Sequence, residues 1–132
     1  MRKILFKGKR IDNGGWIYGS PIFQDGYVLI RFWNSEEFEF EEHLIAPESV
    51  SEYTGLTDKN GNKIFEGDIL DCKSDLYERC KVIYNEFCSA FQLECADGFS
   101  DFFLCSINHK KMEIIGNIHD NPELLKESDN NE

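Results

Sequence analysis

Apolar and polar residues alternate over short stretches along most of the chain, and turn-forming residues separate these stretches. The clearest example is residues 37–41, Glu-Phe-Glu-Phe-Glu. A period of two residues is typical of a β-strand with one face on a core and the other in water. We therefore expect Phe38 and Phe40 to face a core and the glutamates to face water. Few segments show a helical period, so the pattern predicts a mainly β fold.

Turn signals and apolar runs predict where the strands lie. Asn13-Gly14 and Asp25-Gly26 are typical of hairpin turns because Asn and Gly tolerate a positive φ. The stretch from residue 27 to 33 is apolar on both faces, which predicts a strand in the middle of a sheet. Later strands are predicted at residues 64–65, 69–72, 81–87, 90–95, 102–107 and 112–118, with a hairpin turn at Asp97-Gly98 and a polar loop over residues 73–78.

These elements divide the chain into two β regions. Residues 1–52 are predicted to form a small N-terminal β subdomain, with a boundary over residues 47–53. Residues 57–118 contain these later short strands and one long polar loop near Lys73. That number and spacing suit a small SH3-like β-barrel over residues 53–120, on which the N-terminal subdomain would pack.

The end of the chain changes character. Residues 121–132 are predicted to form a short helix followed by a polar tail that begins near Ser128. Asn121 can cap the helix, and Pro122 suits its first position because the missing N–H has no partner there. Glu123 would lie near the positive end of the helix dipole.

The composition is acidic, with a formal net charge of −11 over 132 residues. A field of this sign repels phosphate backbones and anionic membranes, so both are disfavoured as partners, whereas a basic protein partner is permitted. No apolar run approaches the roughly 20 residues that cross a bilayer. The apolar run behind the basic N-terminus is too short for a signal peptide, so we expect a cytoplasmic protein. The basic residues of this N-terminal strand keep a nucleic-acid-binding barrel as the alternative: Arg2, Lys3, Lys7, Lys9 and Arg10.

Cysteine and histidine are the candidates for metal binding or nucleophilic catalysis. The five cysteines include no CxxC pair, whereas zinc ligands usually come in close pairs: Cys72, Cys80, Cys88, Cys95 and Cys105. A cysteine nucleophile would need a neighbouring histidine or a helix N-terminus, and nothing local joins a cysteine to His43, His109 or His119. We therefore expect reduced thiols packed as small hydrophobes, with no metal and no cofactor.

Carboxylates and aromatic side chains are the remaining candidates. Acidic residues are abundant, but their alternating positions indicate a solvated face rather than the paired carboxyls of a glycosidase: Glu36, Glu37, Glu39, Glu41, Glu42, Asp68 and Asp71. No phosphate-binding glycine loop is present in the sequence, and we predict no catalytic residue. Four aromatic residues suit stacking on a base or a peptide, and one or two of them left exposed would mark a binding surface: Trp16, Tyr18, Trp33 and Tyr53.

Three stretches of the sequence belong together by their order and spacing. The first joins residues 2–10, Arg-Lys-Ile-Leu-Phe-Lys-Gly-Lys-Arg, to Gly-Trp-Ile-Tyr-Gly at 15–19. The second joins Tyr-Thr-Gly-Leu-Thr-Asp-Lys-Asn-Gly at 53–61 to Ile-Phe-Glu-Gly-Asp-Ile at 64–69, and the third is Ile-Gly-Asn-Ile-His-Asp-Asn-Pro-Glu-Leu at 115–124. Together they resemble the YopX family of small phage and prophage proteins, over nearly the whole chain.

The resemblance implies a fold and an origin but no activity. It implies an intracellular protein, encoded by a phage or prophage of bacteria, with a mainly β fold and an SH3-like barrel in its C-terminal part. It brings no catalytic residue. We therefore expect an accessory protein that is not an enzyme and that binds a macromolecule, most of all a protein of unknown identity. The sequence leaves the binding residues open, and also the oligomeric state, with self-association among the possibilities.

Overall fold

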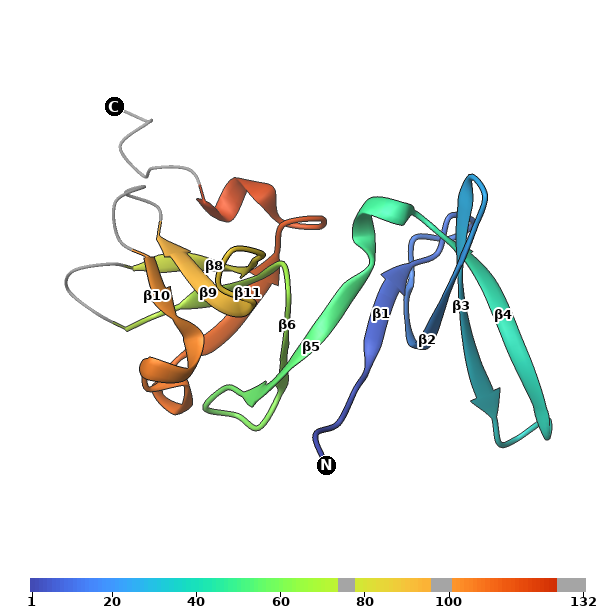
Figure 1. Ribbon diagram of the computed structural model, residues 1–132, viewed down its shortest axis with the longest axis horizontal. Coiled ribbons are helices and arrows are strands. Elements are labelled where there is room, and N and C mark those ends of the chain that lie inside the picture. The colour runs from blue at the N-terminus through green and yellow to red at the C-terminus, as the bar shows by residue number, and fades with distance from the viewer. Residues whose placement is uncertain (74–77, 96–100, 126–132) are drawn as a thin grey trace. The chain divides into compact units, whose positions relative to one another are not determined.

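The computed structural model of the chain describes residues 1–73, 78–95 and 101–125 (Figure 1). Antiparallel strands dominate it, and the helical elements are short 3-10 turns. The fold is therefore mainly β, as predicted. The internal contacts divide the chain into two units, Met1–Tyr53 and Thr54–Glu132.

The first unit is built on one antiparallel sheet. Its elements are β1 (Phe6–Lys9), β2 (Trp16–Gln24), β3 (Tyr27–Asn34), β4 (Glu39–Ile45), the 3-10 turn η1 (Pro47–Ser49) and the start of β5 (Ser51–Thr57). The strands are ordered β4-β3-β2-β1-β5, and β5 pairs with β1 through Ser51 and Glu52 before it continues into the second unit. β3 is paired on both sides, as predicted for this apolar strand.

The sheet of the first unit curls, because the end of β1 also contacts β4. The Ile11 amide donates to the Leu44 carbonyl at 3.1 Å, and the Ala46 amide donates to the Lys9 carbonyl at 2.9 Å. The concave face encloses a small core of buried side chains that β3 and β4 supply: Val28, Ile30 and Ile45.

The second unit contains a five-stranded antiparallel sheet in the order β10-β9-β8-β7-β11. Its elements are β6 (Lys63–Phe65), β7 (Asp68–Asp71), β8 (Arg79–Asn85), β9 (Ala90–Cys95), β10 (Asp101–Phe103), η2 (Leu104–Ser106), η3 (His109–Lys111), β11 (Glu113–Asn117) and η4 (Pro122–Leu125). The core is one continuous cluster of buried side chains: Ile64, Leu70, Cys72, Cys80, Val82, Leu93, Cys95, Leu104 and Met112.

A buried aspartate organises the turn before β6. Asp58 is 2% exposed, and one of its carboxylate oxygens accepts the amides of Asn60 and Asn62 at 2.9 and 3.0 Å. The other oxygen accepts the amide of Ile114 in β11 at 3.0 Å. Burial alone would raise the pKa of Asp58, but these backbone donors outweigh it and the pKa is lowered. The carboxylate thereby fixes the turn to the edge of the five-stranded sheet.

Two predictions about the C-terminal part differ from the structure. The five-stranded sheet is open, with β10 and β11 at its ends, so the SH3-like barrel over residues 53–120 is not confirmed. The predicted helix after Asn121 is wrong within the described residues, because Pro122–Leu125 form only a 3-10 turn. The tail from Ser128 and the predicted Asp97-Gly98 turn lie outside the described residues.

The direction predicted for the two phenylalanines near β4 is also wrong. Phe38 lies in the turn before β4, with a φ of 53°, and is 80% exposed, while Phe40 is 56% exposed. The two-residue alternation is present in β4, but the glutamate side of the strand faces the core and the phenylalanine side faces solvent, the reverse of the prediction. Because Ile45 is buried in the core, strand alternation places residues 43 and 41 on the core side and residues 44, 42 and 40 on the outer side.

Candidate functional site: an aromatic face on the first sheet

The outer face of the β2–β4 sheet carries large apolar side chains. The strand register places Trp33 opposite Phe40, Arg31 opposite Glu42, and Leu29 opposite Leu44, so these side chains share one face. We call this surface the aromatic face and define it by its exposed apolar members, each between 45% and 56% exposed: Tyr18, Tyr27, Trp33, Phe40 and Leu44. Apolar side chains gathered in this way on one sheet face are typical of an interaction surface.

The side chains of this face hold one another in place. The Trp33 and Phe40 rings meet edge to face, with centroids 5.0 Å apart, and Phe38 adds a second edge contact to Trp33 at 6.3 Å. The Arg31 guanidinium carbon lies 4.0 Å from the centroid of the Phe40 ring, a cation–π geometry. Arg31 also lies 3.8 Å from the carboxylate of Glu42. The face is therefore partly ordered before any partner binds.

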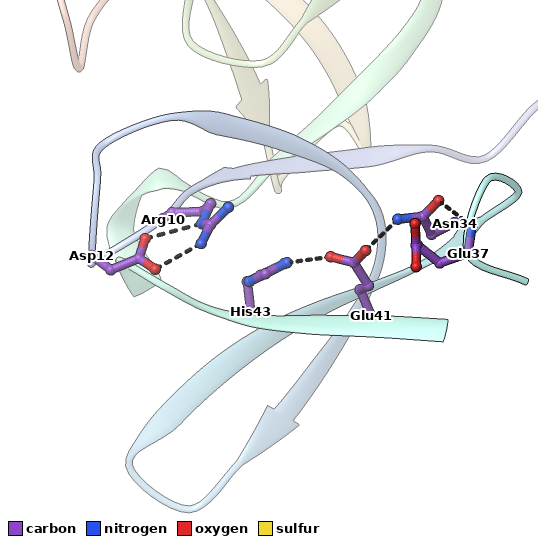
Figure 2. Close-up of polar contacts among 6 residues, drawn as sticks. All are labelled: Arg10, Asp12, Asn34, Glu37, Glu41 and His43. Atoms are coloured by element: carbon purple, nitrogen blue, oxygen red, sulfur yellow. Dashed lines mark hydrogen bonds and ion pairs between the residues drawn. The ribbon is translucent and has the colours of Figure 1, made fainter. Parts of the chain in front are cut away.

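The opposite, concave face ends in a chain of polar contacts (Figure 2). The Asn34 side-chain amide donates to one oxygen of the Glu41 carboxylate, whose other oxygen lies 3.0 Å from His43 Nε2. The Asn34 side-chain oxygen accepts the Glu37 amide at 3.2 Å. The His43 ring also stacks on Phe32, with centroids 5.9 Å apart. These contacts explain why Glu41 is half-buried although the sequence pattern placed it in water.

An ion pair lies beside this chain. The Arg10 guanidinium donates to both oxygens of Asp12, at 2.9 and 2.7 Å (Figure 2). This contact lowers the pKa of Asp12 and raises that of Arg10. Hydrogen bonds from Asn34 and His43 lower the pKa of Glu41. Both carboxyl groups are therefore held in their ionised form.

The carboxyl groups of this region differ from the pair that a glycosidase uses. A glycosidase needs one carboxyl whose pKa is raised so that it can act as an acid, and Glu41 and Asp12 are shifted the other way. The pKa of Asp71 is also lowered. Burial alone would raise this pKa, but hydrogen bonds from Lys73 outweigh the effect of burial. Asp68 accepts the Phe65 amide at 2.8 Å and so shapes the turn between β6 and β7. These carboxylates act as structural acceptors.

The structure gives the cysteines and His109 different surroundings. Cys88 and Cys105 are exposed, whereas Cys72, Cys80 and Cys95 are buried in the second core. His109 Nδ1 lies 2.7 Å from the Thr57 carbonyl. Within residues 1–73, 78–95 and 101–125, no group of three or more His, Cys, Asp or Glu side chains is arranged to hold a metal ion.

Of the four aromatic residues that the sequence singled out, two lie on the aromatic face. Tyr18 and Trp33 are exposed there, Trp16 is half-buried beneath the Lys7 ammonium, and Tyr53 is buried. Sequence reasoning missed Tyr27, Phe40 and Leu44 as members of this surface. The available signal was the apolar outer side of residues 27–33, which needed the β3–β4 register to be recognised as part of a larger face.

Comparison with known proteins places the chain in a family. Residues 19–126 match the family model described as YopX protein. The chain belongs to the YopX family. This confirms the resemblance seen in the sequence. The crystal structure of protein EF1440 from Enterococcus faecalis is similar in fold, with a TM-score of 0.61 and 24% sequence identity, over 96% of this chain and 100% of that one.

The other comparisons add no activity. No curated protein matches the chain. Among the described residues, none of the helical elements has the length and apolar character needed to span a membrane. The family and the solved structure therefore establish a relationship and a fold, and the function has to be argued from the surface.

Proposed function

We propose that this chain is a non-enzymatic binding module of phage or prophage origin, acting in the cytoplasm of the bacterial host, and that its aromatic face binds a protein partner. The observation that carries the proposal is the ordered group of exposed aromatic and aliphatic side chains on β2–β4. Trp, Tyr and Arg contribute most of the binding energy at protein interfaces, and Trp33, Tyr27 and Arg31 lie together on this face.

Charge favours a protein over a nucleic acid. The net charge of −11 repels phosphate backbones. The alternative, a nucleic-acid-binding barrel, relies on the basic N-terminal strand. In that strand Arg10 is paired with Asp12, and Lys7 is 7% exposed with its ammonium 4.5 Å from the Trp16 ring. Arg10 and Lys7 are therefore already engaged within the fold.

The absence of an enzymatic role is supported by the state of the polar groups. The shifted carboxyls of the first unit are stabilised as anions by neighbouring donors. His43 is oriented by Glu41 and stacked on Phe32, which suits a structural role at the end of the core. A robust turnover of some substrate that a single substitution abolishes would overturn this part of the proposal.

The test is an affinity pull-down from host lysate, with and without nuclease, that compares three forms of the protein. The first is the wild type and the second is the double variant Trp33→Ser/Phe40→Ser. The control is Phe87→Ser, which removes a fully exposed phenylalanine from the β8–β9 turn of the second unit. We expect one protein partner to survive nuclease, to be retained by the control, and to fall at least tenfold with the double variant.

Two other results would contradict the proposal. A partner that binds the double variant as well as the wild type would place the binding surface elsewhere. Loss of every partner on nuclease treatment, together with salt-sensitive binding that disappears when the N-terminal cations are neutralised, would favour the nucleic-acid alternative. Circular dichroism of each variant establishes that it is folded before its binding is compared.

A further inference from the structure

Three of the five cysteines lie close together in the core of the second unit. Cys72 follows β7, Cys80 lies within β8, and Cys95 ends β9, and their exposed fractions are 6%, 0% and 3%. The sulfur atoms of Cys80 and Cys95 are 2.9 Å apart. A disulfide bond measures about 2.05 Å, so the two sulfurs need to approach by only about 0.9 Å.

The strand pairing places these two thiols in the favourable kind of cross-strand position. Cys80 and Cys95 are direct partners in the β8–β9 ladder. On the side of β8 that faces away from β9, the Glu78 carbonyl accepts the Cys72 amide and the Val82 carbonyl accepts the Gly67 amide, both at 2.8 Å. Because backbone groups two residues apart point the same way, the amide of residue 80 also points away from β9.

Residues 80 and 95 therefore form a non-hydrogen-bonded pair. In such pairs the Cα atoms lie about 4.5 Å apart and the side chains approach most closely. That separation falls within the range that disulfides adopt, at about 4.4–6.8 Å. This register therefore suits a disulfide between the two strands.

We propose that Cys80 and Cys95 are an oxidation site and form a reversible disulfide when the protein meets a hydroperoxide. One thiolate attacks the peroxide: the O–O bond breaks, an S–O bond forms, and hydroxide, or the alkoxide of an alkyl peroxide, leaves and takes up a proton. The second thiol then attacks the sulfenic acid, so that the S–S bond forms, the S–O bond breaks and water leaves. Two thiols are oxidised and one peroxide is reduced to two molecules of water or, for an alkyl peroxide, to water and an alcohol.

The surroundings of the pair determine how fast it reacts. A hydrogen bond to Cys72, together with burial and the nearby Cys95, raises the pKa of Cys80. The thiolate is the attacking species, so the reaction is slow at neutral pH and becomes faster as the pH rises. Burial adds to this effect because the oxidant has to enter the core. The site therefore responds to sustained oxidation, and it lies in the second unit, whereas the aromatic face belongs to the first.

The experiment uses the full chain with Cys88→Ser and Cys105→Ser, because these two exposed thiols would otherwise form links between molecules. After incubation with hydrogen peroxide, thiol titration of the unfolded protein is expected to fall from three thiols to one. Peptide mapping without reductant should identify the Cys80–Cys95 link, and dithiothreitol should restore all three thiols. The rate should increase between pH 7 and pH 9.

Matched variants separate this pair from its neighbour. Adding Cys72→Ser should leave the disulfide intact, whereas adding Cys80→Ser should prevent any link among the remaining buried thiols. A Cys72–Cys80 link as the main product would overturn the assignment. Three free thiols after prolonged oxidation, in protein that circular dichroism shows to be folded, would also overturn it. If the Cys80→Ser chain does not fold, the map of the three-thiol protein still decides the question.

Discussion

Replacing Asp58 is the sharpest test of how the second unit is held together. This buried carboxylate accepts three backbone amides, two within its own turn and one from Ile114 in β11. Hydrogen bonds to a charged group contribute about 1.5–3 kcal/mol each when they are lost without replacement. Asn60 and Asn62 are exposed, so water can replace part of their loss, whereas the Ile114 amide is half-buried.

These contributions predict graded effects for two substitutions. Asp58→Ala should lower the free energy of unfolding by about 3 kcal/mol, most of it from the Ile114 amide left without an acceptor. Asp58→Asn keeps one acceptor oxygen, but its NH₂ group would face a backbone N–H that needs an acceptor. We therefore expect the free energy of unfolding to fall by about 2 kcal/mol. Glu86→Gln, the same loss of charge in an exposed turn, should change stability by less than about 0.5 kcal/mol.

The assay is native-state hydrogen exchange of the β7 and β8 amides, which reports on the second unit directly. The dependence on pH supplies a second readout. Because the pKa of Asp58 is lowered by folding, its contribution is present above the unfolded value of about 4 and is lost as the pH falls through the folded pKa. The difference between wild type and Asp58→Asn should therefore shrink in acid. Equal stability of the two proteins at pH 7 would refute the reasoning.

Two further predictions concern close packing in the second unit. A Cβ at Gly116 would lie 2.6 Å from the Asn121 side-chain oxygen, so Gly116→Ala should lower the free energy of unfolding by about 1–3 kcal/mol. Urea titration of Gly116→Ala, Asn121→Ala and the double variant measures whether the two positions are coupled. The double variant should lose less free energy of unfolding than the sum of the two single losses, and a strictly additive loss would contradict the contact. A thiol reagent should modify Cys88 and Cys105 rapidly and the three buried cysteines far more slowly while the protein is folded. A third fast thiol would show that the core opens more readily than its burial indicates.

The sequence predicts most of the strands because their signals are local, although residues 104–106 form the 3-10 turn η2 instead of a strand and β5 begins where a boundary was expected. Alternation marked the strands, and the run from residue 27 to 33 correctly indicated a strand with neighbours on both sides. Gly67 adopts a φ of 90° in the turn between β6 and β7, a conformation that favours glycine. Gly116 is needed for a different reason, since a side chain there would overlap Asn121. In these places each residue's requirement can be read from its immediate neighbours.

The barrel and the helix could not be predicted in the same way. Whether a sheet closes depends on pairing between strands far apart in the sequence, and the open order from β10 to β11 is a property of the whole unit. The predicted helix had good capping residues, but a cap stabilises a helix only when the helix is long enough to offset the unfavourable free energy of nucleation. Pro122–Leu125 instead pack as one 3-10 turn, with the Asn121 oxygen accepting the Asn117 amide at 3.2 Å.

The inverted faces of β4 connect the failed prediction to the proposed function. Alternation alone states that Phe40 and Glu41 lie on opposite sides, and hydrophobicity then suggests that the phenylalanine is buried. In this sheet the core side is fixed by Ile30 and Ile45, and Glu41 is accommodated beside them because Asn34 and His43 bind its carboxylate. This sheet holds a half-buried carboxylate on its core side and an exposed phenylalanine on its outer side, which violates the simplest pattern, and such violations are expected where a surface is used. Burial of apolar side chains would place Phe40 in the core, whereas the proposed binding function requires it on the surface, where the structure has it.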